Sequence, residues 1–467
     1  MDLEDLKHAE TFRDRVSSVT EGGKRKWVYA LQPSGKYYRW RNYSSIFYLI
    51  LFFAIPFIWV NGEPLVLLNL LEGKFIIFTK IFWPHDFFIF AVAMITFIIF
   101  IALFTVIYGR LFCGWACPQT IFMEMVFRKI EWWIEGSPNA QRALHDKAWD
   151  AQKLFKKVLK HFLFLFISFL IANTFLAYII GMDELYKIIR EPISQHLSTL
   201  SGLVVFTLLF YGVFAYVRDI VCTTICPYGR LQSVLFDKDT MQVAYDYSRG
   251  EPRGKVQKGQ QRTEGDCIDC KKCVYVCPTA IDIRDGVQME CVGCTACIDA
   301  CDEVMDKVGF PRGLIRYASE NEVSGKGKFH FNTRMKAYTG LLGFLVLFMV
   351  FLISTRRSID TYVKRAQGQL FQEIEQNKLS NLYTAKVINK TSQPQRVRLQ
   401  LENAKGEIRY IGAQEGVLKP EAINELEFFI VLDKEQVLER NTDIQLGVYK
   451  ESERIQLVKT NFLGPFK

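Results

Sequence analysis

The 467-residue sequence lacks three motifs that would place it in common classes of redox or nucleic-acid-binding protein. It contains no Cys-x2-Cys-His, which excludes covalently attached c-type haem. It contains no Gly-x-Gly-x-x-Gly, so nothing indicates that the chain binds NAD or flavin on a Rossmann unit. Lys and Arg outnumber Asp and Glu by 58 to 49, but no basic stretch is interleaved with aromatic residues. The charge surplus therefore does not indicate nucleic-acid binding.

Charge is also absent from five long apolar runs. None of them contains Asp, Glu, Lys or Arg, and a membrane-spanning helix needs about 20 apolar residues. For one or two of the runs the alternative is a buried helix of a soluble core, but the length of the second, third and fourth favours spanning. We therefore predict an integral membrane protein with five transmembrane helices. The runs are Ser44–Val60 (interrupted by Pro56), Phe87–Gly109, Phe162–Met182, Leu197–Val217 and Tyr338–Thr355.

The basic residues of the loops predict the orientation, since loops rich in Lys and Arg stay in the cytoplasm. Residues 1–43 and 110–160 contain nine Lys and Arg each, whereas residues 61–86 and 183–196 contain two each. The N-terminus and the segment after the fourth span are therefore expected in the cytoplasm. Residues 356–467 are then expected outside the inner membrane, in a bacterial periplasm.

Residues 356–467 have the pattern of a small antiparallel β-sandwich. Apolar and polar residues alternate around Val397–Leu401, Leu426–Leu432 and Ile444–Val448, and Gly, Pro and Asn separate the alternating stretches. This region contains no cysteine and no chemical motif. We expect a structural or docking domain.

Eight of the twelve cysteines form two copies of the pattern Cys-x2-Cys-x2-Cys-x3-Cys. This is the run of bacterial two-cluster ferredoxins, in which the fourth cysteine of each copy ligates the other cluster. Zinc sites seldom need four cysteines in eleven residues twice over, and disulfides are unexpected on the reducing side of a membrane. We therefore predict two 4Fe-4S clusters. The ligands of cluster one are expected to be Cys267, Cys270, Cys273 and Cys301, and those of cluster two Cys291, Cys294, Cys297 and Cys277.

The other four cysteines form two Cys-x3-Cys-Pro motifs, Cys113–Pro118 after the second span and Cys222–Pro227 after the fourth. Arg110 and Arg218 precede the motifs in similar positions, so spans one and two and spans three and four look like a weak internal repeat. Because proline opens a helix well, Cys117 and Cys226 are expected at helix N-termini. The repeat would bring four thiols together, which favours Cu(I), zinc or another iron–sulfur centre. Small apolar cysteines in helix caps are the inert alternative.

These features divide the chain into five regions. They are a cytoplasmic N-terminal segment (1–43), transmembrane spans one to four with both Cys-x3-Cys-Pro motifs (44–248), a cytoplasmic two-cluster ferredoxin-like α+β domain with linkers (249–337), span five (338–355), and a periplasmic all-β immunoglobulin-like sandwich (356–467).

At this point the residues identify a family. The chain resembles the cytochrome c oxidase accessory proteins of the CcoG (FixG, RdxA) type over nearly its full length. The double ferredoxin run carries the resemblance, together with GRLFCGWACPQT at 109–120, CTTICPYGRLQSVLFDKDTMQVAYDYSRGEPRG at 222–254 and CDEVMDKVGFPRGLIRYASEN at 301–321. The sequence of the C-terminal region resembles that family's immunoglobulin-like domain more loosely.

The resemblance implies an inner-membrane protein that reduces Cu(II) to Cu(I) for assembly of the cbb-type haem–copper oxidase. The implied partners are copper chaperones and oxidase assembly factors or subunits, besides membrane lipid and an unidentified electron donor. The formation of a homodimer is left open. Cys113, Cys117, Cys222 and Cys226 map onto the family's Cys-x3-Cys-Pro positions, where copper would be held or reduced. Two other functions stay open: a quinol-oxidising electron-transfer subunit, as in four-span polyferredoxins of nitrate reductase systems, and a redox-sensing assembly scaffold.

Overall fold

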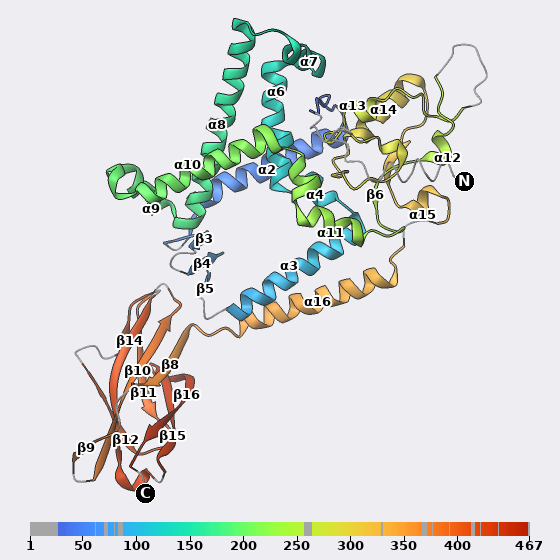
Figure 1. Cartoon of the computed structure of the whole chain (residues 1–467). Coiled ribbons are helices and arrows are strands. Elements are labelled where there is room, and N and C mark those ends of the chain that lie inside the picture. Colours follow the sequence, from blue (N-terminus) through green and yellow to red (C-terminus); the bar gives the residue numbers. More distant parts are fainter. Residues whose placement is uncertain are drawn as a thin grey trace. The chain divides into compact units, whose positions relative to one another are not determined.

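The computed structural model of the chain forms two compact units, and Figure 1 shows the order of their elements along the chain. One unit contains Met1–Asn69 and Phe90–Leu347, and the other contains Leu70–Ile89 and Phe348–Lys467. The structure describes residues 27–60, 62–69, 73–78, 80–82, 87–255, 264–327, 330–366, 371–375, 377–391, 393–411, 416–420, 422–437 and 439–465. Residues 1–26 of the predicted N-terminal segment and residues 256–263 of the linker before the ferredoxin run lie outside these residues.

Among the described residues, four helices are long and apolar enough to cross a membrane. Their side chains turn outward: at most 28% of the most apolar window of each is buried, as suits helices that face lipid. The second to fifth predicted runs are therefore confirmed as helices of spanning length. The helices are α3 (Phe87–Tyr108), α8 (Ala151–Ile180), α10 (Leu197–Gly212, continued by the π-helix η5, Val213–Val217) and α16 (Thr333–Ser354).

The first predicted run, Ser44–Val60, is not one continuous helix, and the prediction of five spanning helices is not confirmed. Helix α2 (Lys36–Ala54) ends within the run and is followed by a 3-10 turn (Ile55–Phe57) and the short strand β1 (Trp59–Val60). Pro56 lies inside this turn, where its missing N–H cannot continue the helix. The uncharged helical part, 44–54, is only about 16 Å long, against about 30 Å for the hydrocarbon core.

Each Cys-x3-Cys-Pro motif lies where a spanning helix gives way to short helices. After α3 come α4 (Leu111–Trp115), α5 (Pro118–Thr120), the π-helix η3 (Ile121–Phe127), α6 (Arg128–Glu135) and α7 (Pro138–Asp146). After η5 come the π-helix η6 (Val221–Ile225) and α11 (Pro227–Leu235), and α9 (Met182–Arg190) links α8 to α10. Short π-helices often occur at functional sites, which directs attention to these two junctions.

The double cysteine run folds as a small α+β region around a two-stranded antiparallel sheet. Strands β6 (Gln242–Tyr245) and β7 (Ile315–Ala318) flank the run in sequence and pair with Gln242 opposite Ala318. Three helices lie between the two strands in sequence: α12 (Tyr247–Gly250), α13 (Lys272–Tyr275) and α14 (Ala296–Val308). The short helix α15 (Glu320–Val323) follows β7. Burial of Val243, Leu314 and Ile315 anchors the sheet beneath the cysteine loops.

The C-terminal region is an antiparallel β-sandwich of two sheets, as predicted. One sheet has the order β12-β14-β10-β8, with β9 also pairing with β10, and the other has the order β13-β11-β15-β16. The alternating apolar residues form its core: Phe428, Ile430, Leu446 and Val448 are all fully buried. The strands are β8 (Ile359–Arg365), β9 (Gln372–Glu375), β10 (Lys378–Asn389), β11 (Gln395–Leu401), β12 (Gly406–Tyr410), β13 (Val417–Leu418), β14 (Ile423–Asp433), β15 (Asn441–Lys450) and β16 (Glu453–Leu463).

Candidate functional site: two cysteine-lined cavities and a four-thiol group

The first cavity of the ferredoxin region is lined by three cysteines of the first run and one of the second. Cys267 and Cys270 come from the loop before α13, Cys273 comes from α13 itself, and Cys301 comes from α14. These are the four residues predicted to ligate cluster one. The rest of the lining is mostly apolar, with Tyr245 and Arg284 among its polar members.

The second cavity has the complementary set. Cys291, Cys294 and Cys297 come from the second run and Cys277 from the first, with Cys273 at the edge shared with the first cavity. The structure therefore places the fourth cysteine of each run at the cavity formed by the other run. All twelve cysteines of the chain are free thiols, so no disulfide competes for them.

The two cysteine loops have the same backbone conformation. Two residues after the first cysteine of each run, Asp269 and Gly293 have positive φ angles of 52° and 66°. Four residues after it, Lys271 and Thr295 have φ angles of 55° and 61° and precede α13 and α14. Repeated left-handed residues curl each loop around its cavity, so that three thiols point inward.

The donor chemistry of both cavities fits an iron–sulfur cluster. Burial raises the pKa of Cys273 and Cys301 to about 12 and that of Cys291 and Cys294 to about 11. Such thiols ionise readily only when they bind a cationic group. In the described part of the chain, no three or more His, Cys, Asp or Glu side chains converge on the position of a single ion. Each cavity is lined by four predicted ligand cysteines, which is the number of thiolates that a 4Fe-4S cluster binds.

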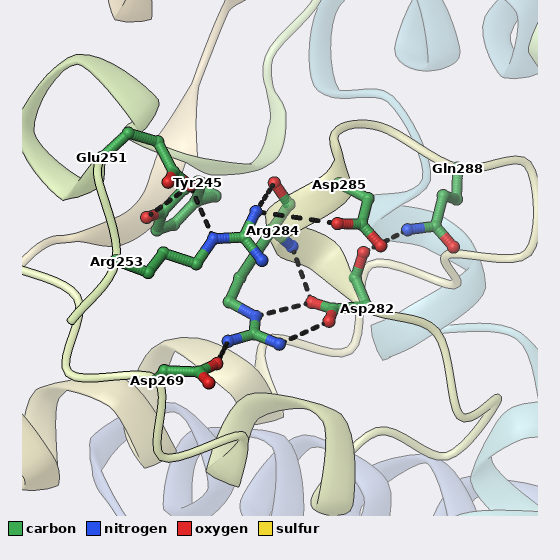
Figure 2. Close-up of polar contacts among 8 residues, drawn as sticks. All are labelled: Tyr245, Glu251, Arg253, Asp269, Asp282, Arg284, Asp285 and Gln288. Carbon is green, nitrogen blue, oxygen red and sulfur yellow. Dashed lines mark hydrogen bonds and ion pairs between the residues drawn. The ribbon is translucent and has the colours of Figure 1, made fainter. Parts of the chain in front are cut away.

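A network of charges surrounds Arg284, a buried residue that lines the first cavity (Figure 2). Arg284, whose side chain is 4% exposed, donates to both carboxylate oxygens of Asp282 and, at 2.6 Å, to Asp269. Burial alone would raise the pKa of Asp282, but Arg284 holds it below its ordinary value. Tyr245 donates its hydroxyl to Glu251, which also accepts from Arg253. The network ties the loop of cluster one to the segment 282–285.

Both Cys-x3-Cys-Pro motifs have the predicted local geometry. Cys117 is the N-cap of α5 and Cys226 the N-cap of α11, each followed by proline at the first helical position. Four residues before the first cysteine of each motif, Gly109 and Arg218 have φ angles of 56° and 57°. In backbone conformation the repeat aligns Arg218 with Gly109, and Arg110 is the next residue along the chain.

The two motifs are interleaved, because each contributes a polar residue beside the first cysteine of the other. The Cys113 thiol donates to Oε1 of Gln232 from α11, at 3.4 Å. The Thr120 hydroxyl from α5 lies beside Cys222. Burial, reinforced by the neighbouring Cys117 thiol, raises the pKa of both Cys113 and Cys222 to about 12. The four thiols, Cys113, Cys117, Cys222 and Cys226, thus influence one another electrostatically, although they do not converge on one point.

This four-thiol group packs against the loop of the second cavity. A Cβ atom on Gly114 would lie 2.6 Å from the carbonyl oxygen of Gly293, so the two backbones touch. Cys222 packs into the apolar cluster that contains Cys294 and Cys297. The second cavity, rather than the first, is therefore the one that lies beside the four thiols.

Arg110 holds this junction together. Its guanidinium donates to the carbonyl oxygens of Met289 and Cys291 in the second cysteine loop and, at 2.5 Å, to that of Gly229 in α11. A single buried cation thus links the first motif, the second motif and the loop of cluster two.

Comparison with known proteins identifies the same regions. Residues 217–320 match a 4Fe-4S dicluster domain, residues 90–137 a 4Fe-4S binding domain, and residues 349–465 the immunoglobulin-like fold at the C-terminus of FixG. Protein RdxB of Cereibacter sphaeroides is 35% identical over 79% of this chain and 80% of its own length. The chain belongs to the FixG/RdxA family.

Two further members of the FixG/RdxA family give the same result. Protein RdxA of Cereibacter sphaeroides is 33% identical over 78% of this chain and 80% of its own length. The nitrogen fixation protein FixG of Rhizobium meliloti is 28% identical over 91% of this chain and 90% of its own. The resemblance and the immunoglobulin-like domain are thus confirmed, and the chain is a membrane iron–sulfur electron-transfer protein.

This FixG/RdxA-family chain also contains a group of buried ion pairs around α6 that no sequence motif indicates. Glu131 on α6 is 5% exposed and pairs with Arg218 and, at 3.5 Å, with Lys160 on α8. Glu135 is also buried and pairs with Lys160 at 2.9 Å. Only the packing of α6 against α8 reveals that these two acidic side chains are buried.

Proposed function

We propose that this protein carries electrons from a cytoplasmic donor to Cu(II), and that the Cu(I) it makes serves assembly of a cbb-type haem–copper oxidase. Each turnover adds one electron to Cu(II), supplied by the donor through the protein. When bound, the 4Fe-4S clusters supply one-electron storage and transfer. The observation that carries the proposal is the contact between Gly114 and Gly293, which joins the four-thiol group to the second cavity.

In this proposal the cysteines have separate tasks. Cys267, Cys270, Cys273 and Cys301 hold cluster one, and Cys270 is the exposed member through which a donor would approach. Cys291, Cys294, Cys297 and Cys277 hold cluster two, whose cavity is the one beside the membrane thiols. Cys113, Cys117, Cys222 and Cys226 are the last protein groups of the route, where Cu(II) is reduced.

The proposed orientation places the ferredoxin region in the cytoplasm and the sandwich in the periplasm. The basic loops 1–43 and 110–160, with nine Lys and Arg each, support it. Helix α16 alone connects the two regions in sequence, and its spanning length fits domains on opposite sides. The sandwich would then be the part available to periplasmic copper chaperones or oxidase subunits.

One observation favours a second candidate, oxidation of a quinol. His161 on α8 and Tyr211 on α10 form a hydrogen bond of 2.9 Å between spanning helices, and Tyr216 stacks on the His161 ring. Such a pair could exchange protons with a quinol headgroup. Reduction of the purified protein by a quinol analogue, abolished in His161→Phe, would favour this candidate.

Titration of reduced protein with Cu(II) tests the copper proposal. Protein purified anaerobically in detergent is reduced with dithionite, freed of reductant and mixed with Cu(II), while visible and EPR spectra follow cluster oxidation and loss of the Cu(II) signal. Stoichiometric oxidation that slows sharply in Cys113→Ser/Cys226→Ser, but not in Thr224→Ser, supports it; Thr224 is an exposed neighbour within the second motif. Equal rates in all three proteins would mean that copper merely oxidises exposed clusters.

A further inference from the structure

Two buried arginines beside the second cavity donate only to backbone carbonyl oxygens among the described residues. Arg41 on α2 is 3% exposed, and its Nε donates to the carbonyl oxygen of Gly114 at 2.7 Å. Arg110 is 6% exposed and donates to carbonyl oxygens of the second cysteine loop and of α11. Nη2 of Arg41 and Nε of Arg110 are buried without a hydrogen-bond partner in the described part of the chain. A buried cation that no carboxylate neutralises is costly, so an anionic group is expected beside these two.

The ferredoxin region itself holds Arg41 in this place. Asp299 on α14 accepts from the backbone N–H groups of Tyr37 and Tyr38, at 3.1 and 2.7 Å, and thereby caps the first turn of α2. Arg41 lies about one turn further along the same helix. The position of its charge is thus tied to α14, the helix that carries Cys297 and Cys301.

Both charges reach predicted ligands of cluster two. Arg41 acts electrostatically on the Cys294 thiol, and Arg110 acts on the Cys291 thiol. In each case the arginine acts more strongly than any carboxylate of the described residues. The negative charge of a thiolate-bound cluster in the second cavity is therefore the anionic group that would compensate these two cations.

The buried arginine of the first cavity is in the opposite situation. Arg284 is paired with Asp282 and Asp269, both at 2.6 Å, so two carboxylates offset its charge. The two cavities therefore differ in their surroundings: carboxylates neutralise the cation of the first, whereas only carbonyl dipoles surround those of the second. Net charge near a cluster is one of the factors that set its reduction potential, and it acts strongly in a buried site.

We propose that Arg41 and Arg110 give cluster two a higher reduction potential than cluster one, and so direct electrons from the first site to the second. One electron leaves the first site and arrives at the second, no bond forms or breaks, and the two arginines offset the negative charge that arrives. The second site is the one beside the four thiols, so the direction is toward them. Entry of electrons at cluster one belongs to the proposed function, but the order of the potentials requires neither copper nor a particular donor.

A potentiometric titration followed by EPR, on the anaerobically purified full-length protein, tests this order directly. Cys270→Ser marks the couple of cluster one and Cys294→Ser that of cluster two, because exchange of a ligand shifts or removes the couple of its own cluster. In the wild type we expect the couple marked by Cys294→Ser to have the higher midpoint potential. The reverse order would overturn the inference, and it would do so without reference to any arginine variant or to copper reduction.

Arg41→Gln tests the role of the charge, since a glutamine amide can still donate to the Gly114 carbonyl oxygen. We expect unchanged iron content, a more negative midpoint potential for cluster two and an unchanged one for cluster one. Arg41→Lys keeps the charge and should stay near the wild type, as should Arg39→Gln, which removes an exposed charge from the same helix. An unchanged cluster-two potential in Arg41→Gln, or equal shifts of both clusters, would contradict the assignment. An equal shift in Arg41→Lys would also contradict it, because the charge would then not be the cause.

Discussion

Gly114 and Gly293 lie backbone against backbone, although one follows a transmembrane helix and the other lies in a ferredoxin loop: a Cβ on Gly114 would approach the Gly293 carbonyl oxygen to 2.6 Å. Neither position tolerates a side chain without movement, since a Cβ on Gly293 would lie 2.8 Å from the Arg110 carbonyl oxygen and its φ is 66°. The two glycines allow the four-thiol group to reach the second cavity.

Gly114→Ala is expected to force these loops apart. The cost should be about 1–3 kcal/mol of unfolding free energy, as for other overpacked sites, with iron content retained and slower cluster oxidation by Cu(II). The measurement is stopped-flow absorbance of the prereduced protein. Gly212→Ala is the matched control, because a Cβ there meets nothing within 4 Å. Equal oxidation rates in both variants would show that the Gly114–Gly293 contact does not influence electron transfer to Cu(II).

Arg284→Gln should weaken the site of cluster one. The substitution removes charge-assisted hydrogen bonds to Asp282 and Asp269, worth about 1.5–3 kcal/mol, and leaves the Asp282 carboxylate without its partner. We expect a lower midpoint of thermal unfolding and faster loss of iron on dilution than in the wild type. Arg312→Gln removes an exposed ion pair with Asp306 and should change stability little, because solvent screens such a pair. Similar losses for both variants would contradict a special role of Arg284.

Glu131 should make stability depend on pH in the acidic range. Burial would raise its pKa, but Arg218 and Lys160 hold it below the ordinary value of 4.5. Because the folded protein binds the proton less readily than the unfolded chain, this contribution is fully present above about pH 4.5 and is lost as pH falls further.

Glu131→Gln tests this pH dependence. At pH 7 the variant leaves Arg218 and Lys160 buried without their carboxylate and should lose about 3–5 kcal/mol. The difference in unfolding free energy between the variant and the wild type should shrink below about pH 4.5. Denaturant unfolding in detergent measures it. The exposed Glu320→Gln should differ little from wild type at any pH. A difference that stays constant with pH would exclude ionised Glu131 as its cause.

The proposed orientation of the chain predicts the behaviour of reporter fusions. Alkaline phosphatase fused after Lys467 should be active, because it folds only in the periplasm, whereas the same reporter fused after Asn332, before α16, should be inactive. A cytoplasmic fluorescent reporter should give the opposite pattern. Activity of the phosphatase at both positions would contradict α16 as a spanning helix.

The sequence by itself determined the features that depend on local spacing and periodicity. Cysteine spacing predicted the two ferredoxin loops and the helix starts at Cys117 and Cys226, and alternation predicted the buried strand residues Phe428 and Ile430. Uncharged length predicted four of the spanning helices. These features follow from chain geometry over a few residues or from the solvent on one face, so they can be read without knowing any distant partner.

Only the tertiary structure decided which of these parts meet. Nothing local to Gly114 indicates Gly293, since a glycine permits close approach but does not specify what approaches. The same holds for Gln232 beside Cys113 and for Glu131 beneath Arg218, where charges or amides that look solvent-exposed in the sequence are buried by another helix. Whether the apolar run Ser44–Val60 forms one continuous helix also lay beyond the sequence, because hydropathy alone does not show where a helix stops.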